Sequence, residues 1–524
     1  MATPPDVEKH YGNGELTVVW KPRLCIHSRK CWEGLPSVFD PDKRPWVTIT
    51  GARSGEIAAQ VRQCPSGALT LLGDPPFQRP SEDRRDVVVE KPKAVVAPVP
   101  ASRVAHRRTV SRDLLIHRLH EAAELEHSLM CTYLYAAFSL RQGVAEGLTA
   151  AEAEATARWR RTIIGVAVEE MGHLAAVWNI TSAVGGSPRF GRSNLPIDPG
   201  LLPASVVAKL APFDEATIQH FVHLERPADS KEPEGAGFET EVRYVRATDR
   251  HRLTPMAVDY ETVGVLYAAI EDNLHSLVDL HGEAAVFCGD PALQLGPAEV
   301  ALTGATPVVS LKSALAAIVS IVEQGEGSPG HSDNSHCSRF TKIRQELAAL
   351  CEANPAFQPA FPAATNPALR QPLRLEGRVW IQDEDAAKTV DLANASYALM
   401  LRLLAYSYVV PTTSGEKGLA VSLAMELMRA VTLLGERAAR LPAVPSHPGR
   451  NAGMSFTTVR DSAPFPPGIA ARRFFTERFA EIAAAVSALG ASDARAVAAA
   501  RMTATVAQRA TAGFAGGVTP PIAP

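Results

Sequence analysis

Three cysteines near the N-terminus have a spacing that suits an iron–sulfur cluster. Cys25 and Cys31 stand six positions apart, and Cys64 follows 33 positions later with a proline directly after it. A cubane cluster is commonly held by C-x2-C-x2-C and a distant C-P, and here Ser28 occupies the second cysteine position. Thiolate sulfur is the soft donor that iron–sulfur centres bind. The pattern therefore predicts a cluster held by Cys25, Cys31 and Cys64.

The type of this cluster depends on a fourth ligand. Three thiolates suit a [3Fe-4S] cluster, whereas a [4Fe-4S] cluster needs one more donor, for which His27 is the candidate. Zinc is the alternative metal, because three cysteines and one histidine also suit a structural tetrahedral site. Three unrelated cysteines in a small domain are a further alternative. We favour the iron–sulfur cluster because the spacing is tight and a CPSGAL segment accompanies it.

A carboxylate interrupts the apolar stripe of the first long helix that we expect, over 111–142. Glu126 stands in the gap between Ala122 and Met130, at the spacing that continues the stripe. An unpaired buried carboxylate costs several kcal/mol, so such a group is normally neutral, paired or bound to a metal. We expect Glu126 to face the core, and Glu124, on another face, to be solvated.

The second long helix, expected over 154–185, repeats this anomaly. Glu170 stands among its apolar residues, and His173 follows one turn later. Glu-x-x-His places both side chains on one face of a helix, about 5–6 Å apart at Cβ. Di-iron carboxylate proteins combine this unit with a glutamate from a neighbouring helix. Glu126, Glu170 and His173 therefore predict a metal centre of carboxylate and imidazole ligands.

A third contribution is expected from the segment IVEQGEGSPGHSDNSHCSRF, residues 321–340. Glu326 continues the apolar face of a helix over 310–326, whereas Glu323 is turned partly aside. A polar loop then leads to His336. The alternative interpretation is a helix end followed by a solvated turn.

The elements that must position these residues fall into regions of different character. Residues 1–73 are predicted to form strands at 15–20, 45–50 and 66–72 and a helix at 56–63, and a Pro-rich linker follows over 74–110. Long helical periods dominate the remainder of the chain. The helices of the region 111–352 are expected at 111–142, 154–185, 258–281, 310–326 and 335–352.

Two further segments complete this organisation. An irregular insertion over 186–257 separates the second long helix from the third, and insertions of this length usually carry function or cover a site. The C-terminal region, 353–524, is predicted to hold helices at 388–408, 415–440, 468–489 and 492–513. We expect these helices to pack on the preceding ones, to shape a substrate cavity or to form a dimer interface.

The composition excludes several classes of function. The chain has 524 residues with 53 basic and 56 acidic side chains, a net charge of −3. We expect no nucleic-acid and no membrane partner, because this balance provides no field that would gather phosphate backbone or anionic lipid. The N-terminus lacks a basic-then-apolar signal segment, and seven cysteines are few for a disulfide scaffold. These features predict a soluble, cytoplasmic protein.

The N-terminal segment resembles a known family. The sequence WKPRLCIHSRKCWEGLPSVFDPDKRPWV followed by VRQCPSGAL is similar to the divergent mono-cluster Fe–S domains of bacteria, over nearly all of residues 10–72. The resemblance implies a small α+β, ferredoxin-like domain that carries one electron at a time. It also supports Cys25, Cys31 and Cys64 as ligands.

A second resemblance covers about 110–345. The segments that carry it are ELEHSLMCTYLYAAFSL, EEMGHLAAVWNITSAVGGSPRF, YETVGVLYAAIEDNL and EQGEG…SHCSRF. They resemble the ferritin-like domain of the iminophenyl-pyruvate dimer synthase type. The resemblance implies a four-helix bundle in a mainly α protein. It implies metal ligands at Glu126, Glu170, His173, Glu326 and His336, with Glu323 a further possibility.

One departure from this family pattern leaves two alternatives open. A regular di-iron bundle has a second Glu-x-x-His on its last helix, which this sequence lacks. Glu326 with His336 can substitute for it, or the helix 258–281 can contribute through Asp272 and His275. We prefer the first alternative, because Asp272 and His275 flank a polar patch that is typical of a wet helix face.

The two regions together predict an enzyme with metal cofactors. Our leading hypothesis is a non-haem oxidoreductase with a dinuclear iron centre, manganese being the alternative metal, supplied with electrons by its own Fe–S domain. Its substrate would be a small, amino-acid-derived molecule, and its partners an external reductase and a second copy of the chain. The alternatives are a dimer-synthase-like coupling enzyme of secondary metabolism and an iron- or oxidant-sensing binding protein.

Overall fold

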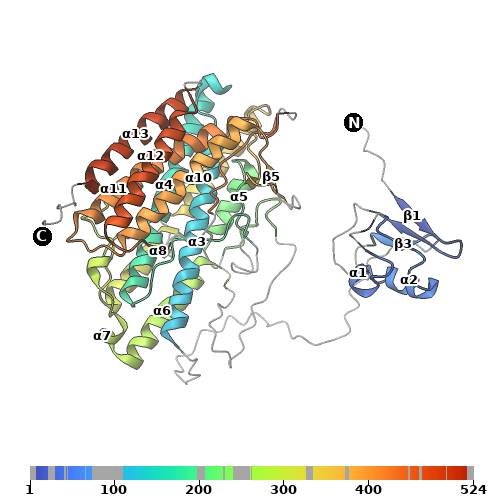
Figure 1. The fold of residues 1–524 in the computed structure, drawn as a ribbon, viewed down its shortest axis with the longest axis horizontal. Helices are drawn as coiled ribbons and strands as arrows, with labels where there is room; N and C mark the ends of the chain where they lie inside the picture. The colour runs from blue at the N-terminus through green and yellow to red at the C-terminus, as the bar shows by residue number, and fades with distance from the viewer. Residues whose placement is uncertain are drawn as a thin grey trace, which may run out of the picture. The chain divides into compact units, whose positions relative to one another are not determined.

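The protein was analysed as a computed structural model. It describes residues 8–21, 30–40, 43, 45–64, 67–73, 110–197, 207–227, 230–239, 260, 262–325, 334–371, 377–445, 449–458, 463–490 and 493–515. Contacts divide the chain into two compact units, 1–104 and 105–524. Figure 1 shows strands and short helices in the first unit and long helices in the second. The expected mainly α fold with a small α+β N-terminal part is confirmed.

The N-terminal unit is a three-stranded antiparallel sheet with two short helices. The strands are β1 (Lys9–Gly12), β2 (Thr17–Trp20) and β3 (Leu69–Leu71), in the order β1-β2-β3, and the helices are α1 (Lys30–Gly34) and α2 (Ser54–Val61). Val18 and Leu69 contribute to a core that Ile57 and Val61 of α2 cover. The strands predicted near 15–20 and 66–72 and the helix near 56–63 are therefore present.

The strand predicted at 45–50 is wrong. Val47 forms only an isolated antiparallel bridge with Phe39. The chain turns directly afterwards, where the amide of Gly51 donates to the carbonyl of Thr48. A Cβ on Gly51 would lie 2.0 Å from the carbonyl oxygen of Ser37, so this close approach requires glycine. The residues of PWVTIT favour a strand, but here they lead into a turn that packs against the segment around Ser37.

The second unit is built from long helices. Those of the first part are α3 (Arg112–Ser139), α4 (Ala150–Ala183), α5 (Glu215–Leu224), α6 (Val263–His281), the short α7 (Glu283–Val286), α8 (Leu311–Gly325) and α9 (His336–Ala353). Those of the second part are α10 (Glu384–Ser407), α11 (Gly415–Ala438), α12 (Ile469–Ser487) and α13 (Ala494–Ala515), preceded by the short parallel pair β4 (Pro367–Ala368) and β5 (Val379–Trp380). The long helices agree with the predicted ones to within a few residues.

Helices α3, α4, α6 and α8 form the bundle, and α5 packs on α9 beside it. The remaining helices run along the bundle (Figure 1): α10 pairs with α11, α12 with α13, and α11 also contacts α3. One continuous hydrophobic core joins residues from α3 to α13. Both sides of α3 and α4 are consequently buried.

Side-chain caps set where the functional helices begin. Ser111 accepts the amide of Leu114 at the start of α3. Thr149 and Glu152 form a capping box at the start of α4. Such caps satisfy amides that the first turn of a helix leaves without partners. Ser335 does the same for α9, which makes His336 the first residue of that helix.

The stretch predicted to be irregular, 186–257, contains a helix in its described part. Asp214 caps α5 by accepting the amide of Thr217. Ile218, Phe221 and Val222 are fully buried on one face of this helix. The irregular interpretation is therefore wrong here, because a helix of ten residues shows too few periods to stand out.

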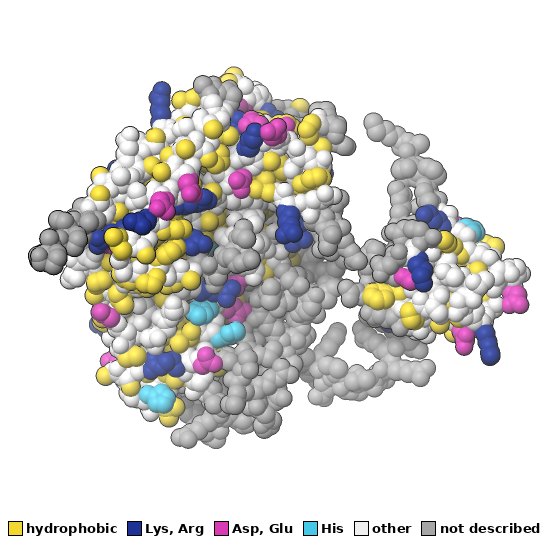
Figure 2. Space-filling model, in the orientation of Figure 1, with side chains coloured by type: hydrophobic (Ala, Val, Ile, Leu, Met, Phe, Trp, Pro, Cys, Tyr) yellow, Lys and Arg dark blue, Asp and Glu magenta, His cyan; other side chains and the backbone are white. Residues whose placement is uncertain are grey.

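Two helices, α4 and α11, are apolar and long enough to cross a membrane by length and composition alone. In α4, 72% of the apolar window is buried within the protein, as expected for a core helix. Figure 2 shows basic and acidic side chains scattered over the visible face without a continuous patch of one sign. This distribution agrees with the near-neutral net charge of −3.

Candidate metal centre

Glu170 lies between two histidines in the interior of the bundle. Its Oε2 atom is 2.9 Å from Nδ1 of His173, and its Oε1 atom is 2.9 Å from Nδ1 of His336. All three side chains are at most 4% exposed. One carboxylate therefore faces two imidazoles, one on each side.

A further glutamate completes each side. Glu126 Oε2 lies 3.7 Å from Nδ1 of His173, and Glu225 Oε2 lies 3.5 Å from Nδ1 of His336. Glu126 comes from α3, and Glu225 directly follows α5. Two groups result, one of Glu126, Glu170 and His173 and one of Glu170, Glu225 and His336, in each of which one atom per residue lies within 4.8 Å of the others.

Both imidazoles are held by an acceptor at their other nitrogen. His173 donates from Nε2 to Oε1 of Gln324 on α8, at 2.9 Å. His336 donates from Nε2 to Oε2 of Glu169, also at 2.9 Å, and Arg339 pairs with the same carboxylate. A neutral imidazole that donates at Nε2 keeps its lone pair on Nδ1, the atom that faces the carboxylates.

Two buried tyrosines hold the outer carboxylates. Tyr267 on α6 donates its hydroxyl to Oε1 of Glu126 at 2.5 Å, and Tyr133 on α3 donates to Oε1 of Glu225. In each glutamate the second oxygen is the one that faces a histidine. Neighbours that hold metal-binding side chains in this way are typical of metal sites in proteins.

The electrostatics show that this cluster needs positive charge. Burial, with the negative charge of Glu170, raises the pKa of Glu126 to about 8. Burial opposes the charged form of His173, but the charges of Glu170 and Glu126 outweigh it and raise the pKa of His173 to about 10. The charges of Glu170 and Glu225 likewise raise the pKa of His336 well above its usual value. Bound protons thus supply the positive charge that balances the buried carboxylates.

The donor set fits two metal ions. Ligand atoms about 2.1 Å from one ion lie roughly 3.0–3.4 Å apart, close to the 2.9–3.7 Å between each histidine nitrogen and its two carboxylate oxygens. Nδ1 of His336 is buried and, although 2.9 Å from Glu170, is not aligned for a hydrogen bond. Its lone pair is therefore available to a cation. Carboxylate and imidazole together suit iron and manganese.

The structure brings together four of the six residues predicted as ligands. Glu126, Glu170, His173 and His336 all belong to the two groups. Glu323 is exposed on α8 and belongs to neither, whereas its neighbour Gln324 contacts His173. Glu326 lies outside the described residues.

The alternative pair on α6 lies away from the centre. Asp272 and His275 are exposed, and His275 pairs with Glu271 at 3.8 Å. Glu124, expected to be solvated, is instead half-buried: it pairs with Arg189 at 3.2 Å and accepts the amide of Ser193. Its position is explained by the loop after α4, which folds back onto α3.

Sequence reasoning missed Glu225. The signal was present, since Ile218, Phe221 and Val222 form an apolar stripe that Glu225 continues one turn later. This is the same anomaly that singled out Glu126. It was overlooked because the helix lies inside a segment predicted to be irregular.

The N-terminal cysteines are only partly described. Cys31 on α1 and Cys64 after α2 are half-buried and both pack against the core of the N-terminal unit. Cys25 and His27 lie outside the described residues. The ligand set of the cluster therefore stays a prediction.

Family comparisons agree with both resemblances. Residues 11–74 match the family described as divergent 4Fe-4S mono-cluster, and residues 119–345 match the family described as ferritin-like. The chain joins a divergent 4Fe-4S mono-cluster domain to a ferritin-like domain. The second match contains every residue of the two groups.

Two relatives of this chain are biosynthetic enzymes. The chain is 29% identical to 2-imino-3-(indol-3-yl)propanoate dimerase of Chromobacterium violaceum over 70% of its own length, and 26% identical to dichlorochromopyrrolate synthase of Lentzea aerocolonigenes over 74%. It covers 35% and 40% of those proteins, little more than a third of their length. A ferritin-like protein of Caulobacter vibrioides matches with 19% identity and a TM-score of 0.40, over 64% of this chain and 97% of that one.

Proposed function

We propose that this protein is a metal-dependent coupling enzyme that joins two molecules of an aromatic, amino-acid-derived imine in secondary metabolism. The observation that carries the proposal is the position of Glu170 between two histidine–glutamate groups. The similarity to a dimerase of an indolyl imino acid supports the substrate class. It favours coupling over the broader oxidoreductase hypothesis.

The reaction is written as an oxidative coupling. Replacing one hydrogen on each of two molecules by a bond between them releases two protons and two electrons. The proposal therefore includes dioxygen, which takes up both and leaves as hydrogen peroxide. Bound iron or manganese supplies Lewis acidity and one-electron redox chemistry at the two groups.

The chain's own residues set up this chemistry. Glu126, Glu170, Glu225, His173 and His336 bind the metals, with the two tyrosines and Gln324 holding the ligands in place. Burial excludes bulk water, which strengthens every charge interaction inside the site. Because the site is deeply enclosed, only small molecules can reach it.

The N-terminal domain is proposed to carry single electrons through a [4Fe-4S] cluster. Because this domain is on the same chain as the bundle unit, it stays at high effective concentration. An external reductase is the proposed partner for this domain, and we propose that the protein acts in the cytoplasm. A homodimer through the C-terminal helices stays a prediction.

The proposal is tested with metal-loaded protein. An L-amino-acid oxidase converts tryptophan or phenylalanine to the imine in the same vessel, and mass spectrometry measures the coupled product. We expect product with the wild-type protein and less than about a tenth of it with Glu170→Ala, whereas Glu323→Ala on exposed α8 serves as the matched control. Equal product with and without the protein would contradict the proposal.

A further inference from the structure

A cavity lies beside the metal centre, on another face of α3 and α4, the two helices that carry Glu126, Glu170 and His173. On α4, Glu170 and His173 belong to the metal centre, whereas the next residues, Met171 and Leu174, line a cavity of about 360 Å³. Consecutive residues on a helix point about 100° apart, so one helix can serve both sites. The cavity is enclosed on its far side by α10 and α11.

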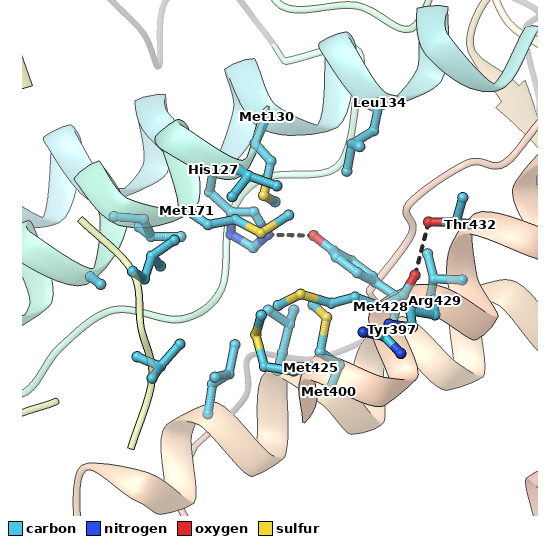
Figure 3. A pocket seen from close by; sticks show the side chains of 18 of the residues that line it. His127, Met130, Leu134, Met171, Tyr397, Met400, Met425, Met428, Arg429 and Thr432 are labelled. Carbon is cyan, nitrogen blue, oxygen red and sulfur yellow. Dashed lines mark hydrogen bonds between the residues drawn. The ribbon is translucent and has the colours of Figure 1, made fainter. Parts of the chain in front are cut away.

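Flexible and aromatic side chains dominate the walls of this cavity. Figure 3 shows Met130 and Met171 on one side and Met400, Met425 and Met428 on the other. The chain has nine methionines in all, so more than half of them gather here. Aromatic lining comes from His127, Phe138, Trp178, Tyr397 and Phe456. Methionine sulfur makes favourable contacts with aromatic rings and adapts to their shape.

The size of the cavity indicates a bicyclic ligand. Protein interiors seldom leave voids larger than a water molecule. A cavity of about 150 Å³ is enough for benzene, so about 360 Å³ holds two fused rings and a short side chain. It also falls within the range of ligand pockets, about 300–1,000 Å³.

The two ends of the cavity differ in charge: the inner end has a neutral hydrogen-bonded pair and the open end has an arginine. At the inner end, Oη of Tyr397 lies 2.5 Å from Nε2 of His127, and both residues are 1% exposed. Arg429 is exposed, as is Val168 with 40% of its surface accessible, so these residues mark the open side. Among the described residues that line the cavity, Arg429 is the only lysine, arginine, aspartate or glutamate. A ligand with its rings inside would therefore meet a positive charge at the mouth.

We propose that this cavity binds an aromatic carboxylate, with the ring system among the methionines and the carboxylate at Arg429. The site is separate from the metal centre, and its ligand binds without metal. Tyr397 and His127 offer polar contacts to a ring nitrogen or hydroxyl at the inner end. An aromatic imino acid belongs to this ligand class, so the inference extends the proposed function without resting on it.

The test measures binding to full-length protein from which metal has been removed by chelation. Indole-3-propanoate is the probe and isothermal calorimetry the method. We expect saturable binding of about one probe per chain, at least about tenfold tighter than binding of uncharged indole or of decanoate. Tighter binding of decanoate would overturn the aromatic class, and equal binding of indole would overturn the role of Arg429. Absence of saturable binding would overturn the site.

Two substitutions locate the probe. Met428→Trp fills the half-buried part of the cavity, and Arg429→Glu reverses the charge at the mouth; each should weaken probe binding at least tenfold. Arg473→Glu, on exposed surface of α12, is the matched control for charge and should bind like wild type. Unchanged affinity in Arg429→Glu, whose side chain is too exposed to threaten folding, would place the probe elsewhere.

A last variant separates this inference from the proposed function. Glu170→Ala removes the residue shared by both metal groups and should bind the probe like wild type. If the wild-type protein binds the probe but shows no coupling activity, only the proposed function fails. If coupling occurs and the probe does not bind, only this inference fails.

Discussion

The imidazole rings of His173 and His336 lie nearly parallel, with 5.5 Å between their centroids and 26° between their planes. One ring comes from the C-terminal half of α4 and the other from the first residue of α9. Each turns Nδ1 toward Glu170 and donates from Nε2 to a different acceptor. This arrangement favours two metal positions that share one carboxylate.

Metal content should depend on Glu170 more than on the outer glutamates. We expect about two metal ions per chain in the bundle of the wild-type protein and fewer than about 0.2 in Glu170→Ala, because both groups lose a ligand. Glu225→Ala should retain about one. Elemental analysis after desalting measures this, and Glu323→Ala should match wild type. Two ions retained in Glu170→Ala would show that the groups do not bind metal.

The two iron sites should be separable. Cys31→Ser and Cys64→Ser should lose the visible absorption of the cluster while the bundle keeps its metal. Glu126→Ala should keep the cluster absorption and lose about one of the two bundle ions, because Glu126 belongs to one group only. Absorption spectra and metal analysis check both outcomes. Cys351→Ser, on the exposed part of α9, is the control. A cluster that survives both N-terminal substitutions would exclude these cysteines as ligands.

The metal-free protein should lose stability as pH rises. In the folded state the pKa of His173 is raised from 6.5 to about 10, chiefly by the charge of Glu170 against the effect of burial. The stabilisation is therefore complete below 6.5 and is lost as pH rises through about 10. Glu126 acts in the same direction, because burial raises its pKa to about 8.

Bound metal should weaken this dependence, since the ion replaces the protons. Urea unfolding at several pH values, with metal and with a chelator, measures the effect. We expect the free energy of unfolding to fall between neutral and alkaline pH only in the chelated sample. The same slope in both samples would argue against metal at these residues.

A single methyl group should disturb the metal-bearing helix. A Cβ on Gly172 would lie 2.1 Å from the carbonyl oxygen of Thr303, so Gly172→Ala should cost about 1–3 kcal/mol and displace the adjacent His173. Gly165→Ala on the same helix meets nothing within 4 Å and should gain about 0.5–1 kcal/mol. Thermal unfolding of both variants checks the difference. Similar effects would show that the close contact is relieved easily.

Much of the bundle could be predicted from the sequence, because local signals set helix ends and faces. The long apolar periods predicted α3 closely, starting at 111 against the observed Arg112. They placed the start of α4 at 154, four residues late, because the capping residue Thr149 was not recognised. Glu126, Glu170 and His173 were recognisable because polar groups on an apolar stripe require an explanation. The strand expected at 45–50 failed because β propensity is easily overridden by tertiary contacts.

The sequence by itself determined which side chains face an apolar interior, and tertiary structure alone decided which of them meet. Periodicity reports the face of one helix and carries no information about the helix opposite. Glu225 therefore entered the site only when α5 packed on α9, and Gln324 rather than Glu323 reached His173. The sequence allowed the C-terminal helices to shape a cavity, but only the structure placed it between α3, α4, α10 and α11, because a void depends on how distant surfaces fit together.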